Sequence, residues 1–331
     1  MEIIFSFLPV LLFLFILYRL DSFKLVKVKM LVMCLLWGML ATFLVYYTNN
    51  WLREQLGLKF EDFSRYGAPL TEEIFKVALV VYLISRKKIG FSVDAAIYGF
   101  AAGAGFSLAE NVFYLLVMNT ETGMMVWLLR GFGTAMMHGG CTALFAMIIM
   151  DGINRNKPLV LAIFPGLIAA FLIHSVFNHF FLNPFLQTAL IFIVLPLVFV
   201  VVFQRSNSVL QNWLEIEFNS EVEMLRMIRQ GKISHTKAGD YLISLKQHFS
   251  PEVLVDLHCY FSLYLELSIK AKRNLMLKEN GFPLIEEADI MEKLLEIKML
   301  RKQVGKLGEL ALQPLVRMNH RELWKLNLLK S

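Results

Sequence analysis

The sequence predicts an all-α, polytopic membrane protein with about seven transmembrane helices and a C-terminal helical domain in the cytoplasm. Of its 331 residues, 57% are apolar and only 18% are charged, whereas a soluble domain is nearer 45–50% apolar and about 25% charged. The apolar residues are gathered in runs of roughly 20, the length that crosses the hydrocarbon core of a bilayer. This composition excludes a disordered chain and a coiled coil, and three cysteines are too few for a disulfide scaffold.

Seven apolar runs are the predicted spans, and they occupy residues 3–20, 30–48, 67–85, 91–118, 124–150, 159–182 and 185–204. The first run has no basic residues before it and no small-residue cleavage site after it. It is also longer than the apolar part of a signal peptide, so we interpret it as a retained span.

The loops between the runs alternate in charge. Basic residues follow the first span (Lys24, Lys27), the third (residues 86–88), the fifth (Arg155) and the seventh (Arg205), while the other loops are acidic, balanced or very short. Because cytoplasmic loops are enriched in lysine and arginine, we expect the N-terminus outside and the C-terminus in the cytoplasm.

The composition changes after the seventh run, which divides the chain into a membrane domain, 1–204, and a second domain, 205–331. The second domain holds 19 Lys+Arg against 16 Asp+Glu, with helical periodicity interrupted at Gly231, Pro251, 281–283 and Pro314. One predicted apolar stripe comprises Leu284, Ile290, Leu294, Leu295, Met299 and Val304. No metal-ligand spacing or phosphate loop occurs, so we expect an all-helical regulatory or partner-binding domain whose partner is unknown.

Ionisable residues inside the predicted spans are the candidates for function, because a charge in hydrocarbon costs several kcal/mol. They are concentrated in spans three to six and comprise Glu72, Glu73, Lys76, Glu110, His138, His174 and His179. With the predicted orientation, Glu72, Glu110 and His174 all fall in the outer half of the bilayer. Asp94 and Arg130 lie near span ends, where we expect them to reach the interface.

Helical spacing assigns these residues to faces. Lys76 can pair with Glu72 or with Glu73, which are about 100° apart, so one carboxylate can face the site while Lys76 holds the other. His174 shares a face with Asn178, whereas His179 lies about 140° away from His174 and is expected at the interface. Small residues around Glu110 and His138 permit close helix approach: Gly99, Gly103, Gly105, Gly131, Gly133, Gly139 and Gly140.

Two chemistries suit this set of side chains. Histidine nitrogens and a carboxylate can hold Zn²⁺, with a second glutamate as general base. Alternatively, a glutamate activates water directly while His and Asn side chains stabilise an oxyanion. Two alternatives remain at this point. One is a buried network that only locks helices together, as in a catalytically silent scaffold, and the other is a proton or ion relay of a transporter or channel.

The ordered motifs resemble those of the PrsW family of intramembrane proteases. The resemblance rests on Glu72-Glu73-x-x-Lys76, Phe106-x-x-x-Glu110, His138 and His174-x-x-x-Asn178 on successive spans, and it covers roughly residues 65–182. A more distant similarity to the CAAX prenyl proteases rests on the paired glutamates and the last histidine motif.

The resemblance implies an intramembrane endopeptidase in a bacterial cell membrane. It implies that Glu72 and Glu73 activate water and that Glu110, His138 and His174 are zinc ligands or transition-state stabilisers. Asn178 would assist them, and Lys76 and Phe106 would support the site. The implied partners are the lipid bilayer and a membrane-anchored protein substrate cut near its extracytoplasmic side, with anti-sigma factors as one substrate class. No nucleic-acid partner is expected.

Overall fold

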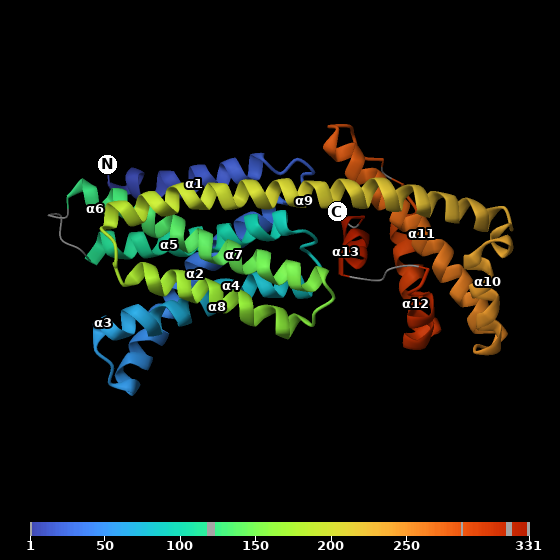
Figure 1. Cartoon of the computed structure of the whole chain (residues 1–331), viewed down its shortest axis with the longest axis horizontal. Coiled ribbons are helices and arrows are strands. Elements are labelled where there is room, and N and C mark those ends of the chain that lie inside the picture. The colour runs from blue at the N-terminus through green and yellow to red at the C-terminus, as the bar shows by residue number, and fades with distance from the viewer. Residues whose placement is uncertain (1, 118–122, 286, 316–319, 330–331) are drawn as a thin grey trace. The chain divides into compact units, whose positions relative to one another are not determined.

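Each of the seven apolar runs contains a helix in the computed structural model, which describes residues 2–117, 123–285, 287–315 and 320–329 (Figure 1). No strand occurs in these residues. The helices of the runs are α1 (Glu2–Arg19), α2 (Val28–Leu56), α4 (Ala68–Ser85), α5 (Ser92–Val117), α6 (Met124–Leu129) with α7 (Ala135–Asn154), α8 (Leu159–Asn178) and α9 (Pro184–Arg229). The all-α prediction is therefore confirmed for the described residues.

Four helical segments among the described residues are long and apolar enough to cross a membrane: Val28–Leu56, Met124–Asn154, Leu159–Asn178 and Pro184–Arg229. The helix α1 is apolar but shorter. The helix α4 carries two glutamates and a lysine in its first half, so its composition alone does not mark it as a span. These residues are the ones that sequence analysis assigns to the site.

The described residues divide into two compact units, Met1–Ser206 and Asn207–Ser331. In the first unit α5 packs against α2 and α7, and α7 also packs against α8. Glycines make these contacts possible: a Cβ on Gly103 would lie 2.2 Å from the carbonyl oxygen of His138, and one on Gly105 would lie 1.9 Å from that of Leu35. The absence of side chains thus lets α5 touch the backbones of both neighbours, as small residues do between membrane helices.

Two short π-helical segments interrupt the regular helices of this unit. The first, Phe63–Gly67, follows the short helix α3 (Phe60–Asp62) and leads into α4, and the second, Arg130–Thr134, joins α6 to α7. A π-helical turn shifts the phase of the side chains on its two sides and is frequent at functional sites. Sequence periodicity did not predict either segment.

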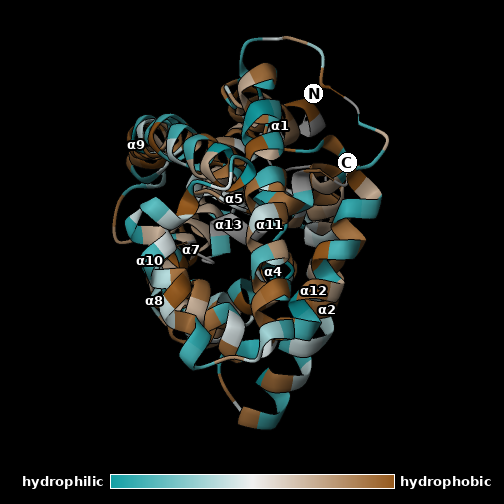
Figure 2. Cartoon of the chain, turned by 90° about the vertical axis from the view of Figure 1, so that its right-hand side faces the viewer, coloured by the Kyte–Doolittle hydropathy of each residue, from teal (hydrophilic) through white to brown (hydrophobic). Residues whose placement is uncertain are grey.

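The second unit is built from the end of α9, α10 (Lys237–Ser244), α11 (Pro251–Glu279), α12 (Ile290–Leu312) and α13 (His320–Leu328), with 3-10 turns at Ile233–His235 and Leu245–Gln247. Its helices mix hydrophobic and hydrophilic residues (Figure 2). The predicted breakers coincide with helix ends: Gly231 and Gly281 have positive φ, Pro251 begins α11, and α12 ends before Pro314.

The predicted stripe on α12 is partly wrong. Ile290, Leu294 and Val304 are buried, and the buried face continues through Ile297 and Leu300. The other members of the stripe, Leu284, Leu295 and Met299, are exposed. Because Leu295 directly follows Leu294, it lies about 100° around the helix from the buried face.

Two fully buried lysines hold this second unit together. Lys272 lies 3.3 Å from Glu217 and 3.1 Å from Glu221, and Lys325 lies 3.2 Å from Glu221 and 2.5 Å from the hydroxyl of Ser268. Both ammonium groups also lie over the ring of Trp213. The pairs connect α11 and α13 to the end of α9.

We expect Gly103→Ala to destabilise the membrane unit, because the new methyl group must push α7 away from α5. Overpacking of this kind costs about 1–3 kcal/mol, and it displaces the backbone that carries His138. The measurement is thermal loss of helical circular dichroism in detergent. Gly123→Ala is the control, since a Cβ on Gly123 meets nothing within 4 Å; equal melting of both variants would contradict the packing argument.

Candidate active site

Glu73 is the centre of the polar cluster that α4, α5, α7 and α8 form. Its Oε1 atom lies 2.5 Å from Nζ of Lys76, one turn along α4, and 2.8 Å from Nδ1 of His174 on α8. The side chains of Glu73 and Lys76 have no exposed surface. Of the two pairings that spacing allows for Lys76, the structure therefore shows the one with Glu73.

Glu72 points a carboxylate oxygen into the same cluster without a hydrogen-bond partner among the described residues. This atom, Oε2, lies 3.7 Å from Nε2 of His174. Because Nδ1 of His174 faces the Glu73 carboxylate, this ring nitrogen carries the proton in the neutral imidazole. The Nε2 lone pair of His174 is then directed toward Glu72.

His138 on α7 lies edge-to-face against His174, with 4.8 Å between the ring centroids. Its Nδ1 atom lies 2.9 Å from Nζ of Lys76, and its Nε2 atom lies 3.4 Å from Oε2 of Glu110 on α5. When Lys76 donates to Nδ1, the neutral ring carries its proton on Nε2, facing Glu110. Phe106 packs beside both groups, 5.2 Å from the His138 ring and 5.0 Å from Nζ of Lys76.

Arg130 belongs to this cluster, although sequence analysis places it at the interface. Its Nη2 atom lies 3.0 Å from Glu110, its Nε atom donates to Asn111 at 2.8 Å, and its guanidinium group lies 3.9 Å from the ring centre of Tyr114. The side chain is only 15% exposed. Arg130 is the first residue of the second π-helical segment, a feature that helical periodicity does not predict.

Asp94 likewise does not reach the interface as expected. It is buried at the start of α5, where its carboxylate accepts hydrogen bonds from the backbone N–H groups of Gly90, Phe91 and Ala95. The carboxylate thus satisfies backbone donors at the start of α5 and stabilises this helix terminus.

The amide of Asn178 is hydrogen-bonded to the backbone before α4. It donates to the carbonyl of Ser64 at 3.0 Å, and the hydroxyl of Ser175 donates to the carbonyl of Arg65 at 2.7 Å. Both acceptors belong to the first π-helical segment, so α8 is fastened to the start of α4. His179 contacts the hydroxyl of Tyr66 at 3.0 Å and is not in the cluster.

The family model of the PrsW family intramembrane metalloproteases matches residues 27–204, more than half of the chain. This chain belongs to the PrsW family. It is an intramembrane protease and an integral membrane protein, as the resemblance of its motifs implies, and the matched region contains every residue of the cluster. No curated protein and no solved structure gives a match.

The donor set of this PrsW protein fits a metal ion. One ligand atom each from Glu72, His138 and His174 lie within 4.8 Å of one another, and two imidazoles with a carboxylate form a common catalytic metal site. The orphaned Oε2 of Glu72 is the observation that favours such a ligand. The metal ligands expected from the sequence are Glu110, His138 and His174, with Glu110 in place of Glu72. In the structure Glu110 pairs with Arg130.

We predict that Arg130 acts on the PrsW site through Glu110. Arg130→Ala should lower the rate of cleavage of a single-spanning model substrate by about 10-fold or more, since small displacements of site groups have large effects on rate. Arg130→Lys should be intermediate, because lysine cannot contact Glu110 and Asn111 with one planar group. In a Glu110→Gln background, Arg130→Ala should lower the cleavage rate little further.

The control for this cycle is Arg155→Ala, which removes an exposed ion pair with Asp151 and should leave cleavage unchanged. An Arg130→Ala loss that is equally large with and without Glu110 would show that Arg130 does not act through this carboxylate.

Proposed function

We propose that this protein hydrolyses a peptide bond of a membrane-anchored protein near its extracytoplasmic side, at the cluster of Glu72, Glu73, His138 and His174. The observation that carries the proposal is the buried, unpartnered carboxylate oxygen of Glu72, 3.7 Å from His174. A carboxylate without a hydrogen bond in a buried site is available to a water molecule or a metal ion.

Glu72 and His174 have the leading roles in the proposed reaction. In the glutamate mechanism Glu72 takes a proton from the attacking water, whereas with zinc bound it would be a metal ligand. In both cases Glu73 orients His174 by accepting a hydrogen bond from Nδ1. Lys76 balances the charge of Glu73 inside the bundle. Histidines oriented in this way by a carboxylate are typical of metal sites, because the second nitrogen is left free.

Zinc is the metal that we propose, held by Glu72, His138 and His174. A bound zinc ion would supply Lewis acidity and lower the pKa of coordinated water. His138 has two possible roles that depend on its tautomer. With its proton on Nε2 it donates toward Glu110 or toward an oxyanion. To bind zinc through Nε2 it would carry its proton on Nδ1, and Lys76 would then give up its contact with Nδ1 and donate to Glu73 alone.

Seven spans with the N-terminus outside are the topology that we propose for residues 1–204. In support, each of the seven apolar runs contains a helix, and basic loops follow every second run. Glu72 then lies about one turn from the outer end of α4. The backbone amides within a spanning helix are hydrogen-bonded to the carbonyls of the same helix. A substrate segment near the outer surface is easier to unwind, so we place the scissile bond there.

The substrate class that we propose is a single-spanning regulatory protein of a bacterial cell membrane, such as an anti-sigma factor. We assign residues 205–331 a regulatory or partner-binding role in the cytoplasm. This assignment is supported by the separate core of the second unit and by its lack, among the described residues, of a His/Cys/Asp/Glu group that could hold a metal.

We expect the two adjacent glutamates to differ when each is replaced by glutamine. Glu72→Gln should reduce cleavage by about 10²-fold or more, and in the metal-free protein it should leave stability unchanged, because Oε2 of Glu72 has no hydrogen bond to lose. Glu73→Gln should reduce both cleavage and stability, because it leaves the charge of Lys76 buried and uncompensated. The expected loss in the free energy of unfolding is about 3–5 kcal/mol.

The measurement for this pair is cleavage of a single-spanning model substrate in liposomes, together with thermal unfolding in detergent. Full activity of Glu72→Gln would exclude it as the base, and a melting temperature lowered equally in both variants would contradict the difference in pairing.

We also expect about one equivalent of zinc in the purified, active protein, measured by elemental analysis. His174→Ala should lose the metal, whereas His179→Ala should retain it because His179 contacts Tyr66 instead of the cluster. Acid should weaken binding, since the imidazole ligands must be neutral. Full activity with less than about a tenth of an equivalent of any transition metal would favour the glutamate mechanism.

A further inference from the structure

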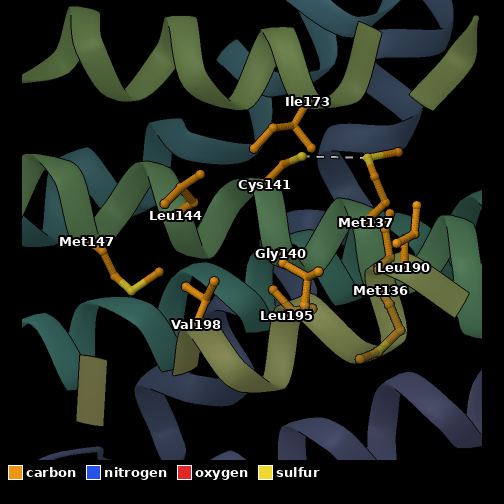
Figure 3. A pocket seen from close by; sticks show the side chains of 12 residues that line it. Met136, Met137, Gly140, Cys141, Leu144, Met147, Ile173, Leu190, Leu195 and Val198 are labelled. Carbon is orange, nitrogen blue, oxygen red and sulfur yellow. Dashed lines mark hydrogen bonds between the residues drawn. The ribbon is translucent and has the colours of Figure 1, made fainter. Parts of the chain in front are cut away.

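An apolar pocket of about 280 Å³ lies between α7, α8 and α9 in the membrane unit (Figure 3). None of the side chains that line it is charged. Six come from α7, one from α8 and five from α9: Met136, Met137, Gly140, Cys141, Leu144, Met147, Ile173, Leu190, Ile191, Val194, Leu195 and Val198. The polar cluster described above does not contribute to this lining.

The pocket and the polar cluster share two helices, α7 and α8. On α7, Met137 and Cys141 lie about 100° and 60° around the helix from His138, both toward the same side. On α8, Ile173 directly precedes His174. The pocket is thus lined by the faces of α7 and α8 that lie next to the faces carrying His138 and His174.

The wall that α9 contributes is the loosely packed one. Only 11% of the most apolar window of α9 is buried, against 78% for the segment Met124–Asn154. Pro196, next to Leu195, removes a backbone hydrogen bond of α9 at the level of the pocket. Three methionines on the opposite wall can adapt to occupants of different shape.

We propose that this pocket binds a large apolar side chain of the substrate, from a residue next to the scissile bond. The inference rests on the proposed function. A peptide bond held at the cluster is extended, so its side chains alternate in direction at about 3.3 Å per residue, and a neighbouring one must enter the adjacent space. The volume exceeds the roughly 150 Å³ that admits a benzene ring, but a whole helix, about 10 Å wide, does not fit.

A lipid acyl chain has similar chemistry, and the position of the pocket favours the substrate. Because the pocket lies on helix faces beside His138 and His174, its fit to a substrate side chain would select which peptide bond is cut. An apolar lining selects leucine, methionine or phenylalanine over alanine and aspartate, and it requires no particular polar group on the substrate.

The first test changes the size of the pocket and measures selectivity. Single-spanning model substrates carry Ala, Leu, Phe or Trp at each position flanking the cut, which is located by mass spectrometry. The wild-type protein should prefer Leu or Phe over Ala by about 10-fold at one position. Leu195→Ala should enlarge the pocket and shift the ratio of Trp to Leu cleavage upward by about 10-fold.

The matched control is Leu197→Ala, on the same helix but 59% exposed and outside the lining, which should leave the ratio unchanged. A ratio unchanged by Leu195→Ala, or changed equally by Leu197→Ala, would overturn the proposal. If the wild-type protein cuts none of the substrates, the proposed function itself fails.

A second test does not depend on cleavage. A photoreactive benzoylphenylalanine replaces Val194, a lining residue that is half exposed, or Leu197 as the control. The substitution is made in a Glu72→Gln protein, which is mixed with the Leu-containing model substrate in liposomes. Cross-linking to the substrate from position 194, in clear excess over position 197, is the expected result. Cross-linking from position 194 to lipid alone, or equally from both positions, would overturn the proposal.

Discussion

The pairing of Lys76 with Glu73 is the interaction on which the polar cluster depends. Both side chains are fully buried, and a single charge left in such surroundings is strongly destabilising. The same carboxylate oxygen accepts from His174, while the lysine also contacts His138. One network of hydrogen bonds and ion pairs therefore both neutralises the buried charges and orients the two imidazoles. Within it, Oε2 of Glu72 has no hydrogen-bond partner among the described residues.

This network requires helices that approach more closely than ordinary side chains allow. Gly103 brings α5 against the carbonyl of His138, and Glu110, about two turns further along α5, comes within 3.4 Å of the imidazole of the same residue. Arg130 balances the charge of Glu110 at the same carboxylate oxygen that faces His138. Small residues and buried charges thus have linked roles, because the ion pairs form only where the backbones are close.

Sequence reasoning predicts the helices of this protein well and its side-chain directions less well. Apolar runs and breakers locate the helix ends, and intramembrane charge identifies Glu72, Glu73, His138 and His174. It does not predict the hydrogen-bond partner of Asn178 or the burial of Arg130, because one π-helical segment supplies the partner of Asn178 and another begins at Arg130. Asn178 shares a face with His174, yet its amide is taken up by the carbonyl of Ser64. Such a partner depends on tertiary packing, which periodicity does not contain.

The helices α7 and α8 each face two environments, and this division suits the hydrolysis that we propose for the polar cluster. Water must be activated by charged groups, so His138 and His174 lie among buried ion pairs. In the proposed function the substrate would arrive as an apolar segment, and the adjacent faces of the same helices present Cys141 and Ile173 to an uncharged pocket. A rigid helix fixes the angle between these faces. The position of an apolar substrate side chain would then be coupled to the position of the catalytic groups without any further contact.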